Sequence, residues 1–235
     1  MFSESVELYD LIYSQLKDYP AEAAVVATKL EELMPGLRTI LDVGCGTGEH
    51  ARHLAGRGYS VDGIDIEPRF VEMARTKSTG TFVCADMMTF DLGRTYDAVL
   101  CLFSSIGYVR TLDGVLAALQ RFRAHLGSGG IVLVEPWFTP EAMADATVHV
   151  HTAEGDGIRV ARMSHTRIEG RLSRLTFEYM VGRASGIERA SEVHELGLFT
   201  VPEMEQAFSE SGFDVEFDPD GLTGRGLYVG RVERR

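Results

Sequence analysis

The chain has 235 residues, of which 45% are hydrophobic, enough to bury one large domain or a core with an added lobe. Its formal net charge of −12 disfavours a nucleic-acid partner, because proteins that bind the phosphate backbone carry a basic face. With no charged-then-apolar leader and no apolar run of about 18 residues, we expect a cytoplasmic protein that binds neither nucleic acid nor membrane.

The first predicted elements are a helix, a strand and a glycine-rich turn. Apolar spacing predicts a helix over residues 21–33, which the following Pro-Gly pair ends. Residues 40–48 read ILDVGCGTG, an apolar strand that breaks into alternating glycines before a short helix over residues 49–54. Such a turn lets backbone approach a ligand and presents unpaired N–H groups at a helix start. We therefore predict a nucleotide-binding loop.

The residues after the glycines restrict which nucleotide could bind. A P-loop NTPase needs Lys and then Ser or Thr where this chain has Glu49 and His50. A dinucleotide fingerprint needs a small residue at position 49, where a carboxylate at a helix start would repel a pyrophosphate. A ligand without phosphate suits this loop better.

Acidic residues follow the next two strands. Residues 59–66 predict a strand that ends near Asp65, about 20 residues beyond Gly44, the spacing at which an acid hydrogen-bonds a ribose diol. Residues 81–87 predict a third strand with Asp86 placed to meet an adenine amino group, and residues 97–103 predict a fourth. These side chains should converge on one crevice beyond the strand ends.

The rest of the chain divides into two patterns. Helices over residues 69–76 and 114–126 and a strand over residues 131–134 complete a doubly wound parallel sheet. Period-two alternation then predicts four antiparallel strands, over residues 148–152, 158–166, 172–181 and 188–198. A helix over 202–211 and strands over 213–217 and 226–232 return to the main sheet. We expect an α/β core of residues 1–137 and 201–235, and an inserted antiparallel lobe of residues 138–200 for substrate binding, dimer contact or both.

Four motifs in order carry a family resemblance: DVGCGTG, GID, ADM and YDAV. Over residues 38–135 the chain resembles the class I S-adenosylmethionine-dependent methyltransferases, which have a Rossmann-like sheet. A narrower resemblance runs nearly end to end. The segments YDLIY, KDY, FSSIGY, VEPW and GRGLYVG are similar to TDP-amino-sugar N,N-dimethyltransferases of antibiotic pathways, which make sugars such as desosamine and mycaminose. This resemblance implies S-adenosylmethionine as cofactor, S-adenosylhomocysteine as product, a TDP-amino sugar as substrate and a homodimer.

The resemblance also implies site residues. The expected cofactor contacts are Tyr13, Gly44, Cys45, Gly46, Asp65, Ile66, Asp86, Met87 and Leu102. The expected substrate contacts are Tyr13, Lys17, Tyr108, Trp137, Phe138, Arg162, Ser164, His165, Arg174 and Arg225. Among these, Arg225 is the strongest choice for the diphosphate, because guanidinium groups bind phosphate in a bidentate way and flanking glycines free its backbone. Arg162, Ser164 and His165 are expected to share one ligand-facing side of a strand.

The expected reaction requires little covalent chemistry from the protein. A sulfonium methyl is already activated, so the site must hold a neutral amine in line with it, and Tyr13 and Tyr108 are assigned to that positioning. Tyr13, His165 and Glu135 are possible proton acceptors, with loss to water as an alternative. The FSSIGY segment replaces the Asp/Asn-Pro-Pro-aromatic motif of DNA amino-methyltransferases, which favours an aliphatic amine.

Other interpretations stay open at this point. The protein could methylate another small amine or a hydroxyl group, because many chemistries share the cofactor half. An oxidoreductase and a non-catalytic S-adenosylmethionine-binding protein are less favoured. The three cysteines, Cys45, Cys84 and Cys101, are expected to pack in the loop and in buried strands, and no metal site is expected. Whether the sugar amine is at C3 or C4 is left open.

Overall fold

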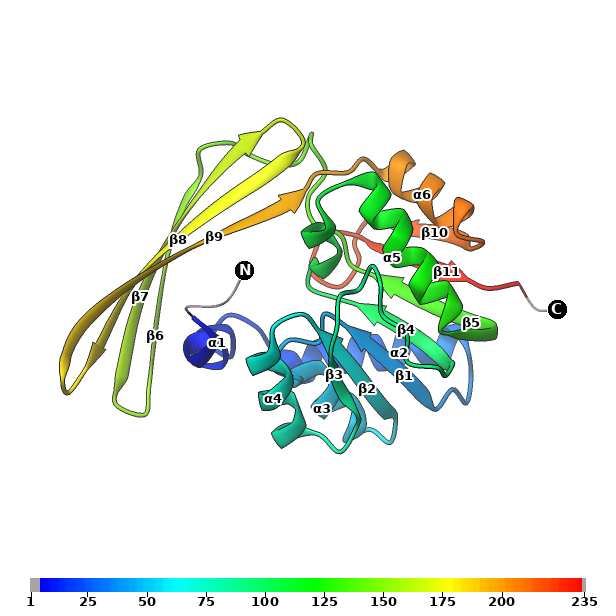
Figure 1. Cartoon of the computed structure of the whole chain (residues 1–235), viewed down its shortest axis with the longest axis horizontal. Coiled ribbons are helices and arrows are strands. Elements are labelled where there is room, and N and C mark those ends of the chain that lie inside the picture. Colours follow the sequence, from blue (N-terminus) through cyan, green and yellow to red (C-terminus); the bar gives the residue numbers. More distant parts are fainter. Residues whose placement is uncertain (1–4, 234–235) are drawn as a thin grey trace.

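A seven-stranded sheet with the order β10-β11-β5-β4-β1-β2-β3 forms the larger part of the molecule (Figure 1). The structure, a computed structural model, describes residues 5–233. Strands β1 to β5 are parallel, whereas β11 runs antiparallel to both of its neighbours. The strands are β1 Thr39–Val43, β2 Ser60–Asp65, β3 Phe82–Cys84, β4 Tyr96–Cys101, β5 Leu126–Val134, β10 Asp214–Asp218 and β11 Leu227–Arg231.

Helices cover both faces of this sheet (Figure 1). One buried cluster joins α5 and α6 to one face, and a second joins α2, α3 and α4 to the other. The helices are α1 Val6–Tyr13, α2 Tyr19–Leu33, α3 Glu49–Ala55, α4 Pro68–Lys77, η1 Ser105–Val109 (a 3-10 helix), α5 Leu112–Ala124 and α6 Val201–Glu210. Across residues 5–233, the structure contains no helix with the length and apolar character needed to cross a membrane.

Local chemistry sets where these helices begin. The Asp18 side chain accepts from the N–H of Ala21 at 3.0 Å, and Pro20 occupies the first turn of α2, where a missing N–H costs nothing. Thr200 and Glu203 form a reciprocal capping box at the start of α6. These caps satisfy backbone N–H groups of the first turn and fix where both helices begin.

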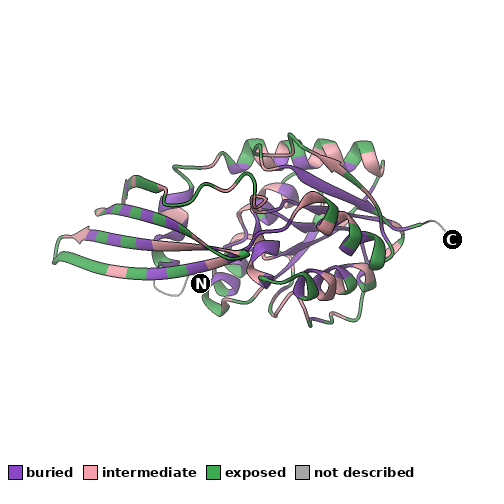
Figure 2. Ribbon diagram, turned by 90° about the horizontal axis from the view of Figure 1, so that it is seen from above, coloured by how far each residue is buried: buried purple, intermediate pink, exposed green. Residues whose placement is uncertain are grey.

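The second sheet is the lobe, four antiparallel strands joined by hairpins. These strands are β6 Val148–Gly155, β7 Ile158–Glu169, β8 Leu172–Arg183 and β9 Gly186–Gly197. Buried and exposed residues alternate along them (Figure 2), so one face is covered and the other is open. The covered face packs on α1, which lies between the lobe and the main sheet (Figure 1). Helix α1 therefore covers the inner face of the lobe.

The predicted α/β class, a doubly wound sheet with an antiparallel lobe, is confirmed. Helix α1 was not predicted as an element, and α2 begins at Tyr19 rather than Ala21. The expectation that Cys84 is buried is wrong: it is exposed at the sheet edge, whereas Cys45 and Cys101 are buried free thiols. Strand β3 is the edge strand of the sheet, so it lacks a neighbour on its far side.

Candidate active site

A cavity of about 490 Å³ lies between the main sheet and the lobe. Its floor follows the carboxyl ends of β1, β2 and β3, where Gly44, Asp65 and Asp86 line it. Its other walls include Tyr13 from α1 and Arg162 from β7. A second cavity, about 40 Å³, adjoins the glycine loop. Ligands of doubly wound sheets bind beyond these strand ends, so the larger cavity is the candidate site.

The glycine loop adopts backbone conformations that other residues reach only with strain. Gly44, Gly46 and Gly48 have φ values of 71°, 54° and 80°. A Cβ on Gly44 would lie 2.7 Å from the Cβ and Oγ of Ser105, the first residue of η1. The glycines therefore bring the loop against η1 and let a ligand touch its backbone.

Asp65 joins the loop to the end of β2. Its Oδ2 accepts from the N–H of Gly46 at 2.8 Å and its Oδ1 from that of Glu67 at 2.9 Å. Burial raises the pKa of this carboxyl, and the backbone donors oppose the rise. Each oxygen keeps a second lone pair for a ligand. Asp86 accepts from the N–H of Met88 at 2.8 Å and also lines the cavity. Two carboxylates suit the hydroxyl and amino groups of a nucleoside and disfavour a phosphate.

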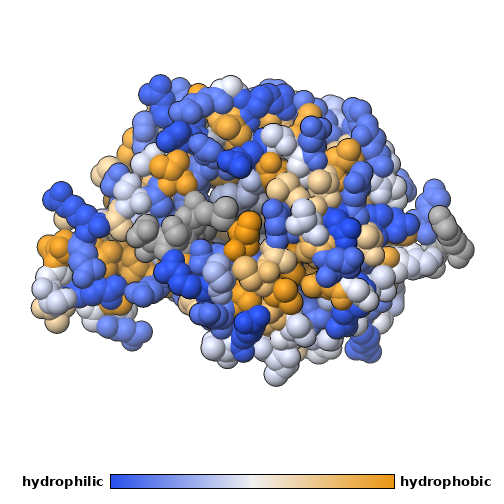
Figure 3. Space-filling view, in the orientation of Figure 1, coloured by the Kyte–Doolittle hydropathy of each residue, from blue (hydrophilic) through white to orange (hydrophobic). Residues whose placement is uncertain are grey.

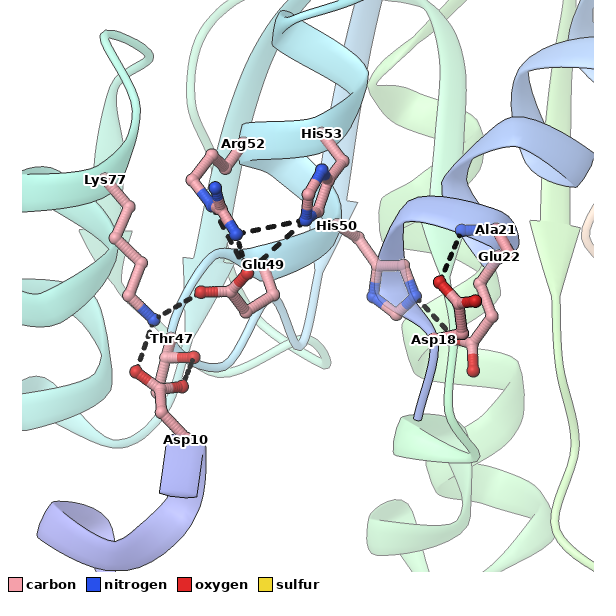
Figure 4. A network of polar contacts seen from close by, with 10 residues as sticks. All are labelled: Asp10, Asp18, Ala21, Glu22, Thr47, Glu49, His50, Arg52, His53 and Lys77. Atoms are coloured by element: carbon pink, nitrogen blue, oxygen red, sulfur yellow. Dashed lines mark hydrogen bonds and ion pairs between the residues drawn. The ribbon is translucent and has the colours of Figure 1, made fainter. Parts of the chain in front are cut away.

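Helix α1 is tied to the loop by an ionic network (Figure 4). Asp10 accepts from the Thr47 hydroxyl at 2.6 Å and from Lys77 Nζ at 2.5 Å. Lys77 also lies 2.9 Å from Glu49, which pairs with Arg52 at 2.6 Å. Glu49, the residue that disfavours a pyrophosphate, is thus held by two cations at the start of α3.

Tyr13 joins α1 to the lobe. Its hydroxyl accepts from Arg162 Nη1 at 3.1 Å, and its ring lies 4.4 Å from that of Tyr9 and 5.5 Å from that of Phe103. Burial raises the pKa of Tyr13, with Arg162 opposing the rise. A phenolate at this position is disfavoured near neutral pH, so the geometry suits a positioning role rather than that of a base.

Glu135 is buried and holds three groups at the cavity's edge. Its carboxylate accepts from the N–H of Phe103 at 2.6 Å, from the Thr223 hydroxyl, and from Arg225 Nη2 at 3.1 Å. Phe103 and Ser104 both have positive φ, at 51° and 63°, a conformation that such contacts must impose. These partners make Glu135 an anchor for Arg225 and the end of β4 rather than the proton acceptor suggested by the sequence.

Two guanidinium groups also line the cavity. Arg162 and Arg225 are each paired through one terminal nitrogen, to Tyr13 and Glu135 respectively. Within residues 5–233, the Nε of each is buried and has no hydrogen-bond partner. A buried donor without a partner is costly, so both fit a ligand that brings acceptor oxygens. Such a ligand would place an anion beside Arg162 and Arg225.

Comparison with known proteins identifies the family. A family profile described as a methyltransferase domain matches residues 40–130. The chain is 41% identical to the dTDP-3-amino-3,6-dideoxy-alpha-D-glucopyranose N,N-dimethyltransferase of Streptomyces fradiae, over 97% of this chain and 90% of that protein. The chain belongs to the TDP-amino-sugar N,N-dimethyltransferase family.

Solved structures agree with this N,N-dimethyltransferase assignment. Streptomyces venezuelae DesVI matches with a TM-score of 0.92 and 38% identity, over 98% of both chains. CalS10, an amino pentose methyltransferase from Micromonospora echinaspora involved in calicheamicin biosynthesis, was solved with S-adenosylmethionine bound. It matches with a TM-score of 0.84 and 38% identity, over 92% of both chains. The protein is an S-adenosylmethionine-dependent N-methyltransferase.

Most residues predicted for this N,N-dimethyltransferase site line the large cavity. They are Tyr13, Gly44, Gly46, Asp65, Ile66, Asp86, Met87, Tyr108, Trp137, Arg162 and Arg225. Cys45 and Leu102 instead line the small cavity beside the loop. Lys17 lies behind the wall, 2.9 Å from Glu22 and 3.6 Å above the Phe103 ring. Phe138 packs on Trp137 with ring centroids 4.8 Å apart and is not among the lining residues.

Three lobe predictions need correction or restriction. His165 does not share a face with Arg162, because residues three apart in a strand point to opposite sides, and His165 is exposed. Arg174 is on the outer face, where Glu195 lies 3.5 Å away. Ser164 is on the buried inner face, but it does not line the cavity. The corrected inner face of β7 presents Arg162 to the site.

The sequence reasoning missed two buried polar residues of β9, Glu192 and His194. The Tyr108 hydroxyl lies 2.7 Å from His194 Nδ1, and both residues line the cavity. The signal was available, because Glu192, His194 and Leu196 alternate on one face of a predicted strand. Choosing the correct face required knowing which side of the lobe α1 covers.

Proposed function

We propose that this protein transfers two methyl groups in succession to the amino group of a TDP-linked aminodeoxysugar in an antibiotic pathway. The observation that carries the proposal is the cavity itself, whose lining combines two acidic side chains, two guanidinium groups and aromatic rings. A phosphate-free nucleoside suits the acidic side chains, and a nucleoside diphosphate suits the guanidinium groups.

The core residues provide the cofactor half of the proposed site. Asp65 would accept from the ribose hydroxyls, Asp86 and Met87 would frame the adenine, and the backbone of Gly44 and Gly46 would run beside the methionine portion. The bound cofactor supplies an activated methyl group on a positively charged sulfur. The buried carboxylates and the aromatic side chains both favour a cation in this cavity.

The lobe and the last turn would hold the sugar nucleotide. Arg162 and Arg225 would bind the diphosphate through their unpartnered Nε groups. Trp137 and Tyr108 would wall the sugar, and the buried Nε1 of Trp137 also has no hydrogen-bond partner within residues 5–233. Since η1 contacts Gly44, the sugar end beside Tyr108 would lie next to the methyl donor.

The protein's contribution to the rate is mainly positioning. A neutral amine must meet the methyl group at near-attack distance, and after the first transfer the spent cofactor must be exchanged before the amine is presented again. Both halves of the site share one cavity, so a monomethylated sugar could remain held by its diphosphate during that exchange.

A panel of TDP-3-amino and TDP-4-amino sugars, incubated with S-adenosylmethionine and followed by mass spectrometry, tests this function. We expect two methyl additions on a TDP-3-amino sugar first, since the relative from Streptomyces fradiae is named for one. If two methyl groups were added to a TDP-4-amino sugar and to no 3-amino sugar, the substrate amine would be assigned to C4. No addition on any member, with tight binding of S-adenosylhomocysteine, would favour a different small amine or a hydroxyl acceptor.

We also propose that the enzyme is a cytoplasmic homodimer. The open face of the lobe exposes apolar side chains in neighbouring strands: Val150 is 59% exposed, Met163 51% and Met180 46%. Figure 3 shows hydrophobic side chains among hydrophilic ones at the surface of the lobe. Such patches favour association. Analytical ultracentrifugation should show a dimer that Met163→Glu dissociates, and a monomeric wild-type protein would contradict this.

A further inference from the structure

A buried chain of polar contacts, made of hydrogen bonds and one ion-pair contact, leads from the cavity into the lobe. It begins at the Tyr108 hydroxyl, 2.7 Å from His194 Nδ1. The other ring nitrogen, His194 Nε2, lies 3.2 Å from Glu192 Oε1. That oxygen also accepts from the Ser5 hydroxyl at 2.7 Å and from the Tyr179 hydroxyl at 2.6 Å. The chain therefore ends on a carboxylate that two hydroxyl groups hold in place.

The partners define the direction of each hydrogen bond. The donors to Glu192 outweigh burial and lower its pKa, so this carboxyl, 3.2 Å from His194 Nε2, favours the tautomer with the proton on Nε2. In neutral imidazole the other nitrogen is then an acceptor, and the Tyr108 hydroxyl donates to Nδ1. A second lone pair on the Tyr108 oxygen is left to accept from a ligand in the cavity.

The surroundings keep the imidazole neutral, which leaves Nδ1 as its acceptor atom. His194 is 1% exposed, and burial is the main reason that its pKa is lowered. Arg162 adds to that effect from β7, whereas Glu192 opposes it from the same strand. The other faces of the ring meet Phe177 at 5.1 Å and Tyr108 at 5.9 Å, measured between centroids.

Tyr108 comes from the element that contacts the cofactor loop. It lies in η1, whose first residue, Ser105, packs against Gly44 so closely that no side chain fits between them. The acceptor oxygen of Tyr108 and the backbone beside the proposed methyl donor are thus positioned by one short helix. An amine in line with the methyl group would be next to that oxygen.

We propose that Tyr108 is the catalytic residue that takes the proton from the substrate ammonium, and that His194 and Glu192 are positioning residues that receive it through Tyr108. The proposal rests on the proposed function. An N–H bond of the ammonium breaks and its proton passes to the Tyr108 oxygen. The former Tyr108 proton passes to His194 Nδ1 at the same time. The result is a neutral amine and an imidazolium paired with the Glu192 carboxylate.

Double methylation needs this path twice. An aliphatic ammonium has a pKa of about 8–10, so the substrate enters mainly protonated, and the first transfer creates a new ammonium. Each must lose one proton before attack, whereas the dimethylated product can leave protonated. The imidazolium returns its proton to water when the cavity opens for cofactor exchange. His194 is therefore neutral again before the next methyl transfer.

The decisive test is the pH dependence of kcat for wild-type enzyme and His194→Gln. The kcat of the wild type should be nearly independent of pH above neutral pH, because Tyr108 and His194 supply the proton acceptor. The variant should be about 100-fold slower at pH 7.5, with a rate that rises tenfold per pH unit toward the amine pKa. Tyr108→Phe should show the same loss and slope, and the double variant should be no slower than either single variant, because the two groups act as one unit.

The controls separate this proposal from misfolding and from failure of the proposed function. His149→Gln makes the same change on an exposed residue of the lobe and should leave rate and profile unchanged. S-adenosylhomocysteine binding by His194→Gln should match wild type within twofold. In ¹⁵N NMR spectra, the His194 signal, assigned by its loss in the variant, should report a neutral ring at pH 7. An active wild type whose pH profile runs parallel to that of His194→Gln would overturn the proposal, as would an imidazolium signal at pH 7.

Discussion

The main sheet and the lobe bury their strands in different ways. Strands β1, β4 and β5 are covered on both faces, so residues such as Leu41, Val99 and Leu133 are fully buried and the sequence reads as unbroken apolar runs. The lobe strands are covered on one face only, and their buried residues include polar ones such as Glu192 and His194. The main sheet is thus a rigid scaffold whose strand ends line the cavity, whereas the lobe brings buried polar side chains to the same cavity.

The largest expected effect is at Asp65, on the sheet side of the cavity. Asp65→Ala should weaken S-adenosylhomocysteine binding by 100-fold or more, since it removes hydrogen bonds to a charged group, about 1.5–3 kcal/mol each, and the acceptor for Gly46. Isothermal titration calorimetry measures this, with Glu210→Ala on the exposed end of α6 as control. An affinity within threefold of wild type would mean that the sheet does not bind the ribose.

A variant of Arg225 tests the proposed binding of the substrate diphosphate. Arg225→Lys keeps a charge for Glu135 but loses bidentate geometry, so KM for the TDP-sugar should rise about 30-fold while kcat and S-adenosylhomocysteine affinity change little. Steady-state kinetics separate these constants. If kcat fell and KM stayed constant, the guanidinium would act near the reacting amine instead of on the diphosphate.

Asp42, a buried carboxylate in the main sheet, should destabilise the protein, so that replacing it should increase stability. Burial raises the pKa of Asp42 to about 6 from 3.8, so its ionisation costs stability as the pH rises between these values. That shift corresponds to about 3 kcal/mol. Within residues 5–233, the buried Oδ2 of Asp42 has no hydrogen-bond partner, so Asp42→Asn should raise the free energy of unfolding at pH 7.5 by about 1–2 kcal/mol and have little effect at pH 4.

Urea denaturation at the two pH values measures this, and Asp97→Asn is the matched contrast. Backbone N–H groups of Arg38 and Thr39 donate to Asp97, and these bonds outweigh burial and lower its pKa. Its stabilising contribution is present at neutral pH and is lost as the pH falls through that lowered pKa. The amide should therefore destabilise the protein at pH 7.5. Two variants that shift stability in the same direction would refute the assignment.

The smallest effect is expected at Asp10, which ties α1 to the glycine loop. Asp10→Asn keeps a hydrogen bond to Thr47 but weakens the pair with Lys77, so S-adenosylhomocysteine should bind about threefold more weakly at low ionic strength. The difference should shrink in high salt, because solvent ions screen partly exposed pairs. Titrations at two salt concentrations check this. A salt-independent loss would indicate a packing defect.

The sequence was most informative where the type of residue and its spacing are both restricted. The glycine loop, Asp65 and Asp86 could be placed because strand ends converge at one edge of a parallel sheet. The lobe was predicted as strands, but not its inner face: His165 and Arg174 were assigned to the site although both are on the outside. A shift of one residue reverses every side chain in a strand, and only the packing of α1 decides between the two faces.

Helix α1 itself gave no clear signal. It has eight residues and mixes tyrosines with acids, and its stability comes from packing between the lobe and the loop rather than from propensity. Glu135 was assigned as a possible base because nothing in the VEPW segment shows that Thr223 and Arg225, far along the chain, occupy its carboxylate. Contacts between distant segments are the part of the site that local patterns do not contain.

The place of α1 also has a consequence for synthesis. Tyr13 is synthesised before the lobe, and its partner Arg162 follows 149 positions later. At roughly 5–20 residues per second, this interval is about 7–30 s. During it, apolar side chains such as Leu8 and Ile12 have no lobe to cover them. The helix that completes the pocket is therefore made first and docked late, so chaperones and codon usage over residues 148–197 should affect the yield of active enzyme.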